Sequence, residues 1–141
     1  MATYMQGALK AGEGASEVST GVGYASFSQT GTNANVTGLT QDITFTLPRN
    51  SQILNVFVDV LTAYDSATSA TLSVGTASGG TQYVSGVNAK TAGRAALTIS
   101  AAQATAMASI TTNTTVVATV TSVGQPTTGT VRVTVHYAIT Q

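Results

Sequence analysis

Hydrophobic and polar residues alternate along two well-defined segments of the chain. In "DITFTL" (42–47), Ile43, Phe45 and Leu47 share one parity and threonines separate them. In "TVRVTVHYAIT" (130–140), one parity holds Val131, Val133, Val135, Tyr137 and Ile139, and the other holds Arg132, Thr134 and His136. Successive side chains of a strand point to opposite faces, so this alternation predicts strands with one buried face and one wet face.

The most apolar stretch, "QILNVFVDVLTAY" (52–64), predicts a long strand. A strict period of two places Leu54, Val56, Val58 and Val60 on one face, which we expect to point into the core. The opposite face is mixed and carries Asn55, Phe57, Asp59 and Leu61. Because this second face also holds large apolar side chains, we expect it to be partly covered.

Shorter patterns predict the remaining elements. Strands are expected at 71–76, with Leu72 and Val74 inward, and at 81–87, 95–100 and 114–122, and the segment "GVGYASFSQTG" (21–31) predicts an edge strand. The alanine-rich "AAQATAMAS" (101–109) favours one or two helical turns. Turn-forming Gly, Pro, Asn and Ser residues separate most of these elements.

About eight alternating strands predict an all-β fold, a jelly roll or a related antiparallel β-sandwich. An immunoglobulin-like topology is less favoured, since its cysteine and tryptophan markers are missing. Residues 1–22 are rich in small and polar residues and are expected to form a flexible N-terminal arm. Residues 23–141 are then expected to form a single β-sandwich domain, in line with the chain length.

The charge content narrows the function classes. The chain has five basic and five acidic residues and a formal net charge of zero. Nucleic-acid binding and a polybasic membrane contact both need a surplus of lysine and arginine, so neither is expected. The N-terminal segment also lacks the basic head and apolar core of a signal peptide. So few charges suit a protein whose surface lies against a partner.

Candidate catalytic groups are scarce, because the chain has one histidine, His136. A Ser–His–Asp arrangement would combine it with Asp59 or Asp65, but the G-x-S-x-G elbow is missing. The same two aspartates could form a glycosidase pair, although the chain has no tryptophan to stack on sugars. We therefore expect no catalytic residues and no enzymatic activity.

Cofactor and metal sites are not expected either. Calcium needs several oxygen ligands and zinc needs Cys or His ligands, and the spacing for either is missing. The glycine-rich segments lack phosphate-loop motifs and are expected to be turns. Asp59 and Asp65 are then structural: we expect Asp59 to pair with a cation or a backbone amide, and Asp65 to form an Asx-turn.

The basic residues Lys90 and Arg94 lie close together in "NAKTAGR". They are candidates for contact with an acidic partner surface, and Lys10 in the arm is a third candidate. The alternative for Lys90 and Arg94 is a solvated loop.

The segment from Ile43 to Arg94 contains a threonine-rich strand ending in "LP", a strand of the type "ILxVxVDVxTAxxS", then "xTLxVGT", a glycine-rich turn, "xYVxxV" and "TAGR". This succession resembles a pattern of tailed-phage particle proteins. It covers about a third of this chain. The resemblance is nearest to the small head decoration, or cement, proteins of short-tailed phages, several of which have a jelly roll or related β-sandwich.

The resemblance implies a non-enzymatic virion protein, made in the host cytoplasm and placed on the capsid surface. Its partner would be the major capsid protein, whose neighbouring subunits it would clamp. Self-association as a dimer or trimer would follow from the symmetry axes of a shell. Two alternatives stay open: another particle component, such as a head fibre base, tail or adaptor protein, and a carbohydrate-binding sandwich.

Overall fold

The computed structural model describes residues 25–33 and 39–139. The strands are β2 (Ala25–Asn33), β3 (Thr40–Leu47), β4 (Ser51–Thr62), β5 (Ser69–Gly75), β6 (Val84–Asn88), β7 (Gly93–Arg94), β8 (Thr114–Val123) and β9 (Thr130–Ile139), and α1 spans Ala101–Ala108. The predicted arm (1–22), with Lys10, lies outside these residues, so the division into arm and domain stays a prediction.

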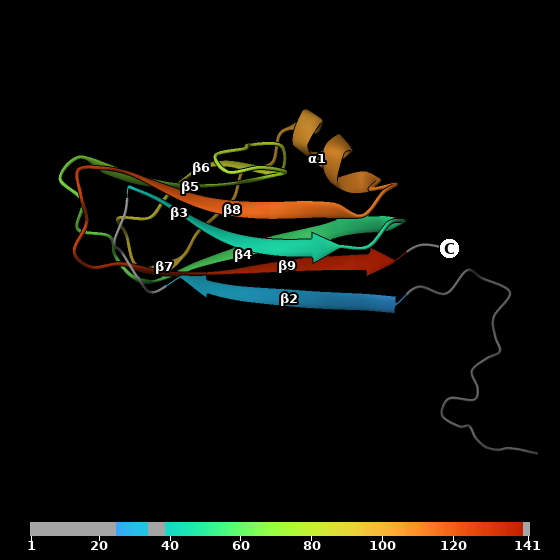
Figure 1. Ribbon diagram of the computed structural model, residues 1–141, viewed down its shortest axis with the longest axis horizontal. Coiled ribbons are helices and arrows are strands. Elements are labelled where there is room, and N and C mark those ends of the chain that lie inside the picture. Colours follow the sequence, from blue (N-terminus) through green and yellow to red (C-terminus); the bar gives the residue numbers. More distant parts are fainter. Residues whose placement is uncertain (1–24, 34–38, 140–141) are drawn as a thin grey trace, which may run out of the picture.

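The strands form two four-stranded antiparallel sheets, with the orders β2-β9-β4-β7 and β3-β8-β5-β6. Figure 1 shows the two layers face to face, with α1 at the end where β8 begins. The chain pairs β2 with β9, β3 with β8, β4 with β7 and β5 with β6. This nesting of pairs is the connectivity of a jelly roll, so the predicted fold class is confirmed.

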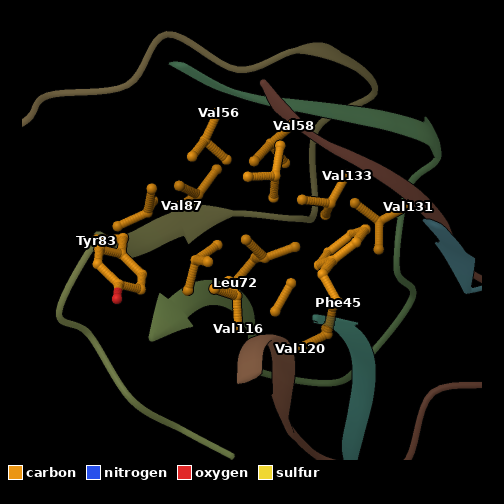
Figure 2. Close-up of a cluster of buried hydrophobic side chains, with 14 of the residues drawn as sticks. Phe45, Val56, Val58, Leu72, Tyr83, Val87, Val116, Val120, Val131 and Val133 are labelled. Atoms are coloured by element: carbon orange, nitrogen blue, oxygen red, sulfur yellow. The ribbon is translucent and has the colours of Figure 1, made fainter. Parts of the chain in front are cut away.

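The core lies between the sheets and follows the alternation of the sequence. Val131, Val133 and Val135 of β9 are fully buried, and so are Leu72 and Val74 of β5. Figure 2 shows Leu72, Val116 and Val120 of one sheet facing Val56, Val58 and Val133 of the other, with Phe45 among them. These β-branched and aromatic side chains pack well on pleated surfaces, which explains why so valine-rich a chain forms a sandwich.

One residue of the long strand was predicted on the wrong face. Leu54 is 45% exposed, whereas its neighbour Ile53 is 4% exposed and belongs to the core. The register with β9 shifts between Ile53 and Asn55, so Leu54 is the extra residue of a β-bulge. Beyond the bulge the expected parity resumes, and Val56, Val58 and Val60 are buried as predicted.

The predicted strand at 95–100 is also wrong. The paired residues are instead Gly93 and Arg94 of β7, which the sequence placed in a loop. The Ala95 amide still donates to the Val58 carbonyl at 2.9 Å, and Ala95 and Leu97 pack against the core. Beyond them the chain leaves the sheet edge for α1, which explains an apolar alternation without a strand.

Helix α1 forms where the alanine-rich segment predicted helical turns. A capping box begins it: the Gln103 amide donates to the Ser100 hydroxyl, and the Ser100 amide donates to the Gln103 side-chain oxygen. The Gln103 side-chain nitrogen also donates to the Thr81 carbonyl at 3.1 Å. With Met107 buried on the core, these contacts fix the helix at one end of the sandwich.

The outer faces of the two sheets differ. On the β3-β8-β5-β6 sheet, Thr119 is fully buried because the segment after β5 folds over it. The Gly79 amide donates to the Thr119 hydroxyl, and the Thr119 and Ser78 hydroxyls donate to Asp42. The outer face of the β2-β9-β4-β7 sheet carries a different polar group, which is the first candidate site.

Candidate functional site

Asp59 and two arginines form a cluster on the outer face of the β2-β9-β4-β7 sheet. Asp59 of β4 lies directly across from Arg94 of β7 on one side and from Arg132 of β9 on the other. Arg94 donates to the Asp59 carboxylate from Nε at 2.7 Å and from Nη2 at 2.9 Å. Arg132 donates from Nη2 at 3.3 Å. We call Asp59, Arg94 and Arg132 the arginine cluster.

The carboxylate of this cluster is covered, while the guanidinium groups reach solvent. Asp59 is 7% exposed, whereas the side chains of Arg94 and Arg132 are 59% and 43% exposed. The hydrogen bond from Arg94 is the main cause that lowers the pKa of Asp59, and burial opposes it. The same bond raises the pKa of Arg94. Two guanidinium groups against one carboxylate give the cluster one net positive charge.

The sequence predicts a partly covered Asp59 with a cation or a backbone amide as its partner, and in the structure its covered carboxylate accepts from Arg94. The sequence did not identify Arg132 as a second partner, because it lies 73 residues away along the chain. Its parity placed it on the wet face of the last strand, but the register between β4 and β9 is needed to bring it to Asp59.

A second polar group ties together the loops at one end of the sandwich. The Asp65 carboxylate accepts from the Thr127 amide at 2.6 Å, from the Thr128 amide at 3.0 Å and from the Thr127 hydroxyl. Instead of a local Asx-turn, these bonds connect two loops far apart in sequence. The Lys90 ammonium group donates to the Ser66 carbonyl, which attaches a third loop.

The contacts of Asp65 predict that the fold loses stability in acid. Its bonds to Thr127 and Thr128 lower its pKa from 3.8 to about 2. Between these two values the unfolded chain binds more protons than the folded chain, so the stability that Asp65 contributes is present above pH 3.8 and is lost as the pH falls toward 2. We expect Asp65→Asn to lower the Tm at neutral pH and to reduce the loss of Tm below pH 4. Thermal unfolding of both proteins from pH 2 to pH 7 measures this. Parallel Tm curves below pH 4 would contradict it.

His136 lies on the outer face of β9 and pairs in register with Asn55 and Ser28. Asp59 is paired with Arg132, four residues further along β9, which places it roughly 13 Å from His136. Asp65 bonds to the loop before β9. The structure therefore does not bring His136 together with either aspartate, and the catalytic combinations considered from the sequence are not formed.

Two of the surface hollows among the described residues adjoin β6 and β4. The larger, about 430 Å³, is lined by β6 and by the segment 91–98, and includes Arg94. The smaller, about 250 Å³, lies between β4 and α1, and its lining includes the apolar residues Leu54, Ile99 and Met107 together with Gln52 and Asn55. Leu54, which the bulge turns outward, forms part of the wall of this second hollow.

No group of three or more His, Cys, Asp or Glu side chains that could hold a metal ion occurs in residues 25–33 and 39–139. Across the same residues, no helix has the length and apolar character needed to span a bilayer.

Comparison with known proteins gives one structural likeness. No protein-family model and no curated protein matches this chain. A solved structure described as "Cyanophage Pam1 capsid asymmetric unit" contains a similar chain, with 24% sequence identity and a TM-score of 0.58. The likeness covers 95% of this chain and 97% of that chain. At this identity it shows a shared fold.

Proposed function

We propose that this chain is a structural component of a phage capsid, and that it decorates the shell as a cement protein. In this role it binds the outside of the capsid and clamps neighbouring major capsid subunits. It acts through contacts alone, without catalysis or a cofactor.

The observation that carries the proposal is the full-length likeness to a chain of a capsid asymmetric unit. The match covers nearly the whole of both chains, so the likeness is not confined to one segment of the sandwich. The sequence pattern between Ile43 and Arg94, which resembles phage decoration proteins, supports the same role independently. Fold alone does not give function, but here fold and pattern agree.

The structure suits a clamp in two respects. The loops at one end of the sandwich are held together by Asp65 and Lys90, so we expect the sandwich to bridge two subunits without deforming. It also carries few charges, which lets large parts of its surface be covered without burying unpaired ions. Weak contacts repeated over a shell add up to firm attachment.

Two further features belong to this proposal. Residues 1–22 would extend over the shell as an arm, adding contacts away from the sandwich. A homo-oligomer, either a dimer or a trimer, would match the symmetry axes at which several capsid subunits meet. Both the arm and the homo-oligomer would contact the major capsid protein.

Reconstitution on shells tests the proposal. Particles are grown with the gene for this chain disrupted, and the purified chain is added back and sedimented with them. We expect saturable binding, and we expect the decorated particles to retain their DNA at temperatures at which bare particles release it. Particles that neither bind the chain nor gain stability would contradict the cement role. Binding only to isolated tails would favour the tail or adaptor alternative, and binding to a glycan array would favour a carbohydrate-binding sandwich.

A further inference from the structure

Within the proposed function, we infer that the arginine cluster is a docking site for a carboxylate side chain of the capsid partner. The inference rests on the proposed function and names the chemistry of one contact. Asp59 accepts two N–H groups from Arg94 and one from Arg132. Each guanidinium has more donors than it uses here, and both side chains are about half exposed. The remaining donors are available to a second carboxylate.

The cluster is held in place before any partner arrives. Arg94 makes a two-point bond to Asp59, and its guanidinium carbon lies 4.9 Å from the centre of the Phe57 ring. Asp59 is fixed in turn by its position between β7 and β9 in the sheet. A preorganised guanidinium loses less side-chain entropy on binding than a mobile one. This distinguishes the cluster from an ordinary solvated arginine.

Charge also favours an acidic ligand. Two guanidinium groups face one carboxylate, so the cluster has a surplus of one positive charge. The other carboxylates of the described residues are engaged elsewhere, since Asp42 bonds to Thr119 on the other sheet and Asp65 bonds to Thr127. Bidentate arginine–carboxylate bonds are among the stronger polar contacts in proteins. An aspartate or glutamate of the partner therefore fits the site better than a neutral side chain.

Lys90 and Arg94, which the sequence groups as candidate partner contacts, have different contacts in the structure. The Lys90 ammonium group bonds to the Ser66 carbonyl inside the chain, whereas Arg94 keeps an exposed guanidinium next to Arg132. The larger hollow adjoins this position, because Arg94 also lines it. A partner segment lying along the hollow would place an acidic side chain within reach of the cluster.

Arg132→Gln tests the inference with little risk to the fold. The substitution removes one guanidinium and leaves the two-point bond between Arg94 and Asp59 intact. The matched control is Arg49→Gln, which removes the same charge from the exposed turn before β4, about 25 Å from the cluster. The probe is the shell lacking this chain, titrated with each purified protein in sedimentation assays. We expect Arg132→Gln to weaken binding about tenfold or more, and Arg49→Gln to change it less than about twofold.

The outcomes are distinct. Equal affinities of Arg132→Gln and Arg49→Gln would overturn the inference while leaving the proposed function intact. If the wild-type chain itself does not bind the shell, the proposed function fails and the inference fails with it. Should Arg132→Gln lower the Tm by more than a few degrees, Arg132→Lys replaces it, because lysine keeps the charge but loses the planar fork. A lysine variant that binds as tightly as wild type would then overturn the inference.

Discussion

Replacing Ile53 by alanine should lower the free energy of unfolding by about 3 kcal/mol, whereas replacing its neighbour Leu54 should cost about 1 kcal/mol or less. Ile53 is 4% exposed and packs in the core, so its loss leaves a cavity between the sheets. Leu54 is 45% exposed and only lines a surface hollow. Two adjacent apolar residues thus differ strongly in how much they contribute to the free energy of unfolding.

Equilibrium unfolding in urea measures both variants under the same conditions. Each variant is the other's control, since both shorten a branched four-carbon side chain to a methyl group on the same strand. The bulge in β4 sets the difference. If Leu54→Ala cost more than Ile53→Ala, Leu54 would lie in the core as strict alternation predicts, and the bulge would be wrong.

Replacing Gly129 by alanine should destabilise the fold by about 3 kcal/mol, through backbone strain and overpacking together. Gly129 has φ +150°, and an added Cβ would lie 2.5 Å from Cγ of Tyr64. The Tyr64 ring is 1% exposed and cannot move aside without disturbing the core. The loop before β9 therefore needs a residue without a side chain at this point.

Gly93→Ala is the matched control for this substitution. Gly93 also has a positive φ, +123°, but an added Cβ would meet nothing within 4 Å. It should show the backbone strain alone, about 1 kcal/mol. Thermal and urea unfolding give the comparison. Equal losses for the two variants would mean that Tyr64 does not pack against Gly129 as described.

The sequence predicts most of the fold because a sandwich converts alternation directly into two faces. On β9, every residue of one parity from Val131 to Tyr137 is buried, and Arg132, Thr134 and His136 lie on the other face. The helix at 101–108 is likewise predictable, because it is local and its alanines favour it.

The errors arise where pairing depends on residues far apart in the chain. The bulge at Leu54 is a feature of the ladder with β9, which the pattern of β4 alone does not contain. The apolar residues of 95–100 pack on the core without forming a ladder, since the chain turns away toward α1. The contact between Asp59 and Arg132 was not predicted for the same reason, because only the β4–β9 register brings the two residues together.

The candidate site is less predictable than the fold for a physical reason. A docking site for a partner needs a side chain that is both charged and exposed. The exposure of a cation depends on the hydrogen-bond partners that its own chain provides. Lys90 and Arg94 look alike in the sequence, yet one donates to a carbonyl of its own chain and the other stays exposed over Phe57. Their roles in partner contact stay predictions until binding is measured.

A reconstruction of the virus particles that carry this chain is the most direct measurement. The cement role predicts density for the eight-stranded sandwich on the outer surface of the shell, bridging neighbouring major capsid subunits at two- or three-fold axes. In such a map, Arg94 and Arg132 should face an acidic side chain of a capsid subunit. Density for the sandwich confined to the portal or the tail, or particles that lack the chain altogether, would contradict the account.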